Sequence, residues 1–212
     1  MNSNKRRYGD RVKDLRATIE ESHVILLVTS ARNGDRAAFG RLADLFWGDI
    51  FRMVYYRTFS RMDAEDLTQE IFIRAFAKLP KLKETEKFKP WLYSIAVNRV
   101  LDFLRKKRLL SILGFSKAAD TSHELEETET NSPSALDAIT KKEFWTEVYR
   151  FSESLSAMER QVFVLRFMDE LNISEIAEVL EKDESSIKTH LYRSIAKFRR
   201  KPGLLRILRD GI

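Results

Sequence analysis

The sequence of 212 residues contains no cysteine, and its three histidines are scattered along the chain at His23, His123 and His190. Without cysteine, the protein has no disulfide framework, no thiolate nucleophile and no zinc site built on cysteine ligands. The separation of the histidines argues against a clustered metal site, so we expect neither a metal nor another cofactor. The apolar run from His23 to Ala31 is too short to cross a bilayer, which leads us to expect a cytoplasmic protein without membrane insertion.

Glycine and proline are also scarce, at seven and four residues. Most periodic segments place apolar residues three to four positions apart, which is the spacing of an α-helix. We therefore expect an all-α protein. Lysine and arginine outnumber aspartate and glutamate by 38 to 32, which gives a formal net charge of +6. This charge favours a polyanionic partner, although charge alone does not separate nucleic acid from an anionic membrane surface.

The chain is long enough for two compact domains of about 80 residues each. Composition marks the boundary between them, because residues 109–140 contain six acidic residues, one lysine and no arginine, as expected of a linker. We therefore predict a basic N-terminal extension at residues 1–22, a first helical domain at 23–108, the acidic linker at 109–140 and a second helical domain at 141–212.

Three helices are expected in the first domain. Asp63 is a suitable N-cap for the second of them, and Pro90 suits the first turn of the third, where a missing N–H does no harm. The first helix carries an apolar stripe, expected to be buried, formed by Phe39, Leu42, Ala43, Phe46, Ile50 and Met53. The residues of the second helix expected to pack inward are Leu67, Ile71, Ala75 and Phe76.

A separate stripe of the second helix carries acidic and amide side chains in an otherwise basic protein. Its members recur at helical spacing and are Asp66, Gln69, Glu70 and Ile73. Carboxylates repel DNA phosphates, and their combination with an apolar side chain suits a protein partner that presents basic residues. Two alternatives are a solvated acidic face, which the periodicity alone favours, and a carboxylate metal site, which lacks a convergent third ligand.

The third helix and the segment before it combine basic residues with apolar and aromatic ones. The sequence LPKLKETEKFKPW interleaves four lysines with Leu82, Phe88 and Trp91, a pattern that can hold a single nucleic-acid strand. One face of the following helix runs into a basic end suited to phosphate binding and carries Asn98, Asp102 and Arg105. The alternative is a solvated loop in which the tryptophan belongs to the core.

Residues 172–180 and 184–199 form two predicted helices joined by a short turn, with the dimensions of a helix-turn-helix. Predicted capping boxes start helices after Ser156 and Asn172, and Asp183 caps the last helix. One side of the last helix is expected to be buried and carries Ile187, Leu191, Ser194 and Phe198. The other side offers hydrogen-bonding groups to DNA bases and carries Ser185, Lys188, Thr189 and Tyr192. The alternative is an ordinary helical hairpin with a solvated polar face.

Three motifs in this order resemble the extracytoplasmic-function class of bacterial RNA polymerase sigma factors. DAEDLTQEIFIRAF, from Asp63 to Phe76, is similar to the polymerase-binding helix of that family. FKPWLYSIAVNRVLDFLRK is similar to its minus-10 element, and LSAMERQVFVLRF with SEIAEVL and SIKTHLYRSIAKFR is similar to its minus-35 domain. The resemblance covers residues 31–199 and implies an initiation factor with no catalytic activity, which recruits core polymerase to promoters and assists their melting.

The resemblance also implies partners and a role for each set of residues. The acidic stripe, Asp66, Gln69, Glu70 and Ile73, would dock on the coiled coil of the polymerase beta-prime subunit; the beta flap, promoter DNA and an anti-sigma factor are the other expected partners. The loop Pro80–Lys87 would receive an extruded base of the minus-10 element. The expected minus-10 residues are Leu82, Lys83, Phe88, Lys89, Trp91, Asn98, Arg99, Asp102 and Arg105. The expected minus-35 residues are Ser185, Ser186, Lys188, Thr189, Tyr192 and Arg193.

Some positions depart from the family pattern. Glu170 and Glu181 stand where glycine is common, Lys182 replaces a usually apolar turn residue, and Leu82 takes a loop position often held by an aromatic. These departures leave open the geometry of the turns and the identity of the captured base. The alternative function, from a different class, is an autonomous helix-turn-helix regulator that binds duplex DNA as a dimer without polymerase.

Overall fold

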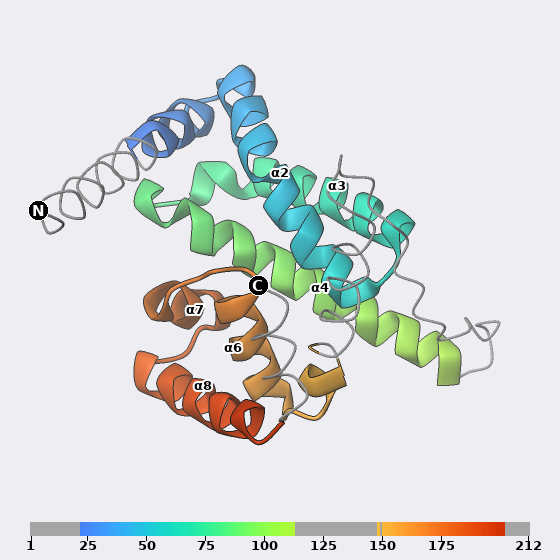
Figure 1. Ribbon diagram of the computed structural model, residues 1–212. Coiled ribbons are helices and arrows are strands. Elements are labelled where there is room, and N and C mark those ends of the chain that lie inside the picture. The colour runs from blue at the N-terminus through green and yellow to red at the C-terminus, as the bar shows by residue number, and fades with distance from the viewer. Residues whose placement is uncertain (1–21, 113–147, 149, 202–212) are drawn as a thin grey trace, which may run out of the picture. The chain divides into compact units, whose positions relative to one another are not determined.

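The computed structural model describes residues 22–112, 148 and 150–201, in two compact units that we treat separately (Figure 1). All regular elements within these residues are helical, as the sequence predicts. Among the same residues, no helix combines the length and the apolar character that a membrane-spanning segment requires. The predicted N-terminal extension, except Ser22, and the predicted linker beyond Ile112 lie outside the described residues.

The first unit contains long helices joined by short turns and two 3₁₀ segments. Its helices enclose a core to which each contributes one apolar stripe. The predicted linker begins inside the last of these helices, which continues four residues beyond Arg108, to Ile112. The elements are a helix at residues 22–32, α2 (Arg36–Thr58), α3 (Arg61–Lys78), η1 (Leu79–Lys81), η2 (Thr85–Lys87) and α4 (Phe88–Ile112). The division between the two units falls within α4, after Phe103.

The predicted apolar stripe of α2 does face the core. Leu42, Ile50 and Met53 are fully buried, whereas the ring of Phe46 is half-buried and packs edge-on against Phe88, with centroids 5.4 Å apart. Trp47 lies beside this stripe and stacks on Phe72 of α3 at a centroid distance of 5.7 Å. These aromatic pairs join α2 to its neighbours, each contributing about 0.5–1.5 kcal/mol beyond the area buried.

The predicted start of α3 is wrong, because the helix begins at Arg61 and Asp63 lies in its first turn instead of capping it. The carboxylate still lies near the positive end of the helix dipole. The inward orientation of Phe76 is also wrong, since this side chain is 42% exposed while Phe72 is buried. Phe76 instead packs against Phe39 in a T-shaped arrangement, at a centroid distance of 4.9 Å.

The second unit is a helix-turn-helix supported by a third helix, and α8 packs against both α6 and α7. Both predicted capping boxes form, and the Asp183 carboxylate accepts the backbone N–H of Ser186 at 2.8 Å. A cluster of apolar side chains joins these helices to the helical residues that precede them. The helices are α6 (Ala157–Phe167), α7 (Ile173–Leu180) and α8 (Glu184–Arg199), and the cluster comprises Val148, Phe151, Leu155 and Phe163, with Met168 and Phe198 against it.

Two turns in this unit place glutamate in the left-handed backbone region. The φ angles are 56° at Glu170 and 52° at Glu181. These are the two positions where the family that the sequence resembles commonly has glycine. After α7 the Lys182 N–H donates to the Ala177 carbonyl at 2.9 Å, which is the long bond of a Schellman motif. The substitution for glycine therefore keeps the turn geometry and adds backbone strain, because a Cβ disfavours this conformation.

We expect Glu181→Gly to stabilise the second unit by about 1 kcal/mol, because glycine adopts the left-handed conformation without steric cost. For a domain of this size the melting temperature should rise by roughly 4–8 °C, measurable by calorimetry. Ala196→Gly is the matched control, since Ala196 is exposed in the interior of α8 and glycine there should cost about 1 kcal/mol. Equal destabilisation by both substitutions would contradict the strained turn.

Candidate nucleic-acid interface

The predicted acidic stripe of α3 lies on the surface. Asp66, Gln69 and Ile73 are exposed, with Ile73 at 68%, and opposite them Leu67 and Ile71 are buried. The stripe is longer than the sequence reading suggested, because Met62, four residues before Asp66, is 71% exposed. Helical spacing could have identified Met62. The stripe thus combines acidic and amide groups with exposed apolar side chains at both ends, the composition of a protein-binding surface.

Glu70 differs from the other members of the stripe because it bonds to α4. Its Oε2 accepts a hydrogen bond from Arg99 Nε at 2.6 Å, and the Arg99 side chain is only 13% exposed. A charge-assisted bond of this length to a largely buried guanidinium stabilises the packing of α3 on α4. One residue expected to meet polymerase and one expected to meet DNA are therefore bonded to each other.

The segment expected to capture a base divides into core and surface residues. Leu82 is 8% exposed and Phe88 is 1% exposed, so both belong to the core, in contrast to the expectation that their side chains contact the minus-10 strand. The ring of Phe88 packs against that of Phe46 from α2, and its centroid lies 5.7 Å from the centroid of the half-buried Trp91 ring. Lys83 is exposed. Because lysines flank Leu82 and Phe88 in the sequence, the pattern there indicated surface positions for both.

The face of α4 expected to lie along DNA is open to solvent. Asn98, Asp102 and Arg105 are exposed along it, and the helix continues into the exposed basic run at residues 105–108. The opposite face is buried and carries Tyr93, Ala96, Val97 and Val100. Such a helix can present an amide and several cations to a phosphate backbone while its apolar stripe stays in the core.

The polar side of α8 is exposed as predicted, opposite a buried side formed by Ile187, Leu191 and Ser194. Lys188 is held by Glu184, one turn earlier, with Nζ and Oε2 2.9 Å apart. Glu184 was not included in the predicted site, although the spacing of four residues could have revealed the pair. Of the expected base-facing residues, Ser186 is half-buried and the exposed ones are Ser185, Lys188, Thr189, Tyr192 and Arg193.

The start of α8 is fixed by Asp183. Its carboxylate accepts hydrogen bonds from the Ser185 hydroxyl, at 2.5 Å, and from the Ser186 N–H. These bonds lower the pKa of Asp183 below its usual value, and the bond from Ser185 has the largest effect. The cap stays ionised and keeps the first turn ordered. Because base contacts from a recognition helix come mainly from its N-terminal part, this ordering acts on the residues expected to read DNA.

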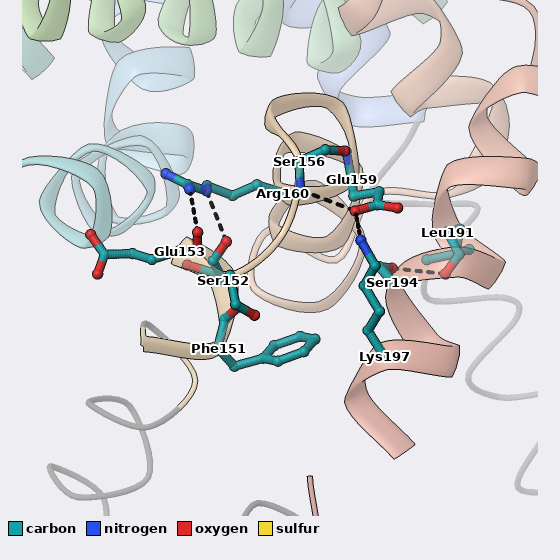
Figure 2. Close-up of polar contacts among 10 residues, drawn as sticks. Phe151, Ser152, Glu153, Ser156, Glu159, Arg160, Leu191, Ser194 and Lys197 are labelled. Carbon is teal, nitrogen blue, oxygen red and sulfur yellow. Dashed lines mark hydrogen bonds and ion pairs between the residues drawn. The ribbon is translucent and has the colours of Figure 1, made fainter. Parts of the chain in front are cut away.

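A second polar network holds α8 on α6 (Figure 2). Glu159, 5% exposed, accepts the Ser156 N–H at 3.0 Å within its capping box and also binds Lys197 Nζ at 2.5 Å. The hydrogen bond from Lys197 is the main cause that lowers the pKa of Glu159, followed by that from Ser156. Nearby, Arg160 donates to the carbonyls of Ser152 at 2.8 Å and Glu153 at 2.9 Å.

Comparison with protein families gives two matches in the same order as the two units. Residues 45–109 match the model described as Sigma-70 region 2, and residues 146–198 match Sigma-70, region 4. The chain is 31% identical over 180 residues to the ECF RNA polymerase sigma factor BldN of Streptomyces coelicolor, an alignment covering 84% of this chain and 66% of that protein. It is 30% identical over 168 residues to the ECF RNA polymerase sigma factor SigW of Bacillus subtilis, covering 78% of this chain and 89% of that protein.

A solved structure supports the fold. The sigma factor RpoE, in complex with the anti-sigma factor NepR from Bartonella quintana, aligns with a TM-score of 0.58 at 19% identity, covering 81% of this chain and 96% of that chain. Both family matches fall on the helices that carry the acidic stripe, the exposed face of α4 and the polar side of α8. The chain therefore belongs to the extracytoplasmic-function RNA polymerase sigma factors, non-catalytic proteins that direct RNA polymerase to promoters through regions 2 and 4.

Proposed function

We propose that three separate faces of this sigma factor bind three different partners. The stripe of α3 from Met62 to Ile73 binds the coiled coil of the polymerase beta-prime subunit, the exposed face of α4 binds the melted minus-10 strand, and the polar side of α8 enters the minus-35 major groove. One observation carries this assignment: each face is exposed on a helix whose opposite face is buried, and the three differ in charge and chemistry.

Charge separates the polymerase face from the DNA faces. The carboxylates of Asp66 and Glu70 on α3 repel phosphates and attract basic side chains, whereas the exposed arginines and lysines at the end of α4 do the reverse. The exposed Ile73 and Met62 add apolar area that the acids alone do not supply. This combination favours docking of α3 on a protein that presents basic residues around an apolar centre.

Burial refines the minus-10 set. Leu82 and Phe88 shape the loop from within the core, and Arg99 supports Glu70 from a largely buried position. The residues proposed to touch the unpaired strand are therefore Lys83, Lys89, Trp91, Asn98, Asp102 and Arg105. Among these the lysines and arginine neutralise phosphates, and Asn98 can donate and accept hydrogen bonds at a base edge.

Other partners follow from the family and its solved complexes. The minus-35 domain is proposed to bind the beta flap of core polymerase. The RpoE structure holds an anti-sigma factor, and we propose a partner of the same kind for this chain. Run-off transcription with and without core polymerase tests the functional assignment as a whole. Specific initiation only from the mixture is expected, together with weak binding to promoter DNA by the protein alone, and tight duplex binding without polymerase would support an autonomous regulator.

For α8 we expect Lys188→Ala and Arg193→Ala to weaken holoenzyme binding to a promoter. The loss is about 1–3 kcal/mol, or roughly 5- to 150-fold, for a residue that reads a base, and smaller for one that contacts phosphate. Competition binding between promoters that differ in the minus-35 element, repeated at several salt concentrations, separates the cases. A base contact changes the preferred sequence, whereas a phosphate contact lowers all affinities alike and flattens the salt dependence.

Glu184→Ala provides a control of opposite sign, because it removes the carboxylate that holds Lys188 and leaves that cation for DNA. We expect this variant to bind the promoter as tightly as the wild type or more tightly. If neither Lys188→Ala nor Arg193→Ala changes promoter binding, then α8 is not the recognition helix.

A further inference from the structure

An arginine from the start of the first unit holds the backbone of the proposed minus-10 loop. Arg32 lies in the last turn of the helix at residues 22–32, and its Nη1 donates to the carbonyl oxygens of Leu82 and Lys83, each at 3.2 Å. Fifty residues separate Arg32 from Leu82 in the sequence. Arg32 also lies outside residues 45–109, which match the region 2 model.

The two carbonyl groups belong to the least regular part of the loop. Leu82 follows η1 with φ −69° and ψ 115°, and Glu84 precedes η2 with φ −106° and ψ 108°, so the backbone is extended here. The loop's own backbone hydrogen bonds lie at its two ends, from the Leu82 N–H to Leu79 at 3.0 Å and from the Lys87 N–H to Glu84 at 3.2 Å, and an ion pair joins the side chains of Glu84 and Lys87 at 3.1 Å. The Arg32 guanidinium therefore supplies bonds at the middle of the loop, where helical bonds end.

The bond pattern suits arginine in particular. The two hydrogens of a guanidinium Nη point in fixed directions within one plane, so a single nitrogen can hold two successive carbonyls and fix the orientation of both peptide groups. The buried side chain of Leu82 anchors the same residue from the core side. The buried Leu82 side chain and the two bonds from Arg32 restrict rotation of the backbone at Lys83, whose side chain is exposed to solvent.

We propose that Arg32 is a positioning residue for minus-10 recognition: it sets the loop conformation in which Lys83 and its neighbours meet the unpaired strand. This inference rests on the proposed role of the loop in minus-10 binding. Arg32 acts through the loop backbone. A substitution should therefore change opening and base preference at the minus-10 element while polymerase binding and minus-35 recognition stay unchanged.

Three variants test the role of Arg32. Arg32→Ala removes both bonds, and Arg32→Lys keeps the charge but shortens the side chain and loses the planar pair of hydrogens. Arg41→Ala is the matched control, because Arg41 is an exposed arginine on the neighbouring helix α2. Amide hydrogen exchange at Leu82 and Lys87 reports the loop directly and requires no transcription. Initiation from promoters with a randomised minus-10 element reports its function, and co-purification reports binding to core polymerase.

We expect Arg32→Ala to speed exchange at these amides by about tenfold or more, as for the loss of a bond from a charged donor. Initiation from duplex promoters should fall by a similar factor, with relaxed minus-10 base preference, and Arg32→Lys should show most of both effects. Arg41→Ala should behave as wild type. Full activity of Arg32→Lys would instead indicate a simple charge contact with phosphate and would overturn the positioning role.

The outcomes also separate this inference from the proposed function beneath it. If deleting Lys83 and Glu84 changes minus-10 preference but Arg32→Ala changes neither exchange nor preference, the inference fails and the role of the loop stands. If the deletion leaves minus-10 preference unchanged, the loop does not read the promoter, and the proposed function and the inference fail together.

Discussion

Asp66→Lys combined with Ile73→Ala is expected to abolish binding to core polymerase, because it replaces attraction by repulsion and removes an exposed apolar contact. Losing one close charge pair at an interface costs about 2–5 kcal/mol, which corresponds to a roughly 30- to several-thousand-fold loss of affinity. Titration of labelled core polymerase by fluorescence measures this directly. Asp44→Lys is the matched control, since it reverses an exposed acid on α2 that is not a member of the stripe, and it should bind normally.

Glu70 is left intact in this variant for a structural reason. Reversal to lysine would place a second cation beside Arg99, whose Nε lies 2.6 Å from the carboxylate in the wild type. The largely buried Arg99 would then lack its partner, and instability of α3 on α4 could be mistaken for lost binding. Undiminished affinity of the Asp66 and Ile73 double variant, with an unchanged melting temperature, would show that α3 is not the polymerase-binding helix.

Asn98→Ala, and separately a deletion of Lys83 and Glu84, should impair promoter opening far more than recruitment of polymerase. Unpairing and unstacking a base costs a few kcal/mol, which contacts to the freed strand must offset. We therefore expect at least a tenfold loss of transcription from duplex promoters and a much smaller loss from templates already melted at the minus-10 element. Permanganate reactivity of unpaired thymines measures the opening step itself.

Lys106→Ala serves as a comparison for these variants, because it removes an exposed cation from the same helix. Its effect should appear equally on duplex and pre-melted templates, as a general loss of phosphate affinity. The same uniform loss in Asn98→Ala and in the deletion variant, with normal polymerase binding, would show that neither contributes to base capture.

Local signals in the sequence predicted the helix-turn-helix well. Each capping box joins a side chain to a backbone N–H three residues away, so Ser156, Asn172 and Asp183 could be identified without tertiary information, and the structure confirms all three. The start of α3 was harder, because Asp63 looks like an N-cap while the helix begins two residues earlier, after a turn in which Phe59 has a φ of 52°. Because phenylalanine and not glycine occupies this left-handed position, the sequence does not indicate the turn.

Periodicity also predicted which faces of α3, α4 and α8 are exposed, apart from Phe76 on α3, since it depends only on spacing along one helix. It could not predict the long-range bonds. Glu70 and Arg99 are 29 residues apart, Glu159 and Lys197 are 38 apart, and Arg32 and Leu82 are 50 apart. The burial of Phe88 depends likewise on Phe46 from another helix. These contacts arise from packing between elements, and a single sequence shows no pattern that pairs them.

The most direct measurement is transcription by core polymerase from a promoter library randomised at both the minus-35 and minus-10 elements, followed by sequencing of the transcribed promoters. Wild-type protein should select defined sequences at both elements. Of Lys188→Ala and Arg193→Ala, the variant that removes a base contact should alter the selection at the minus-35 element alone, and Asn98→Ala should alter it at the minus-10 element alone. Changes at the opposite element, or equal changes at both, would contradict the assignment of α8 and α4 to separate parts of the promoter.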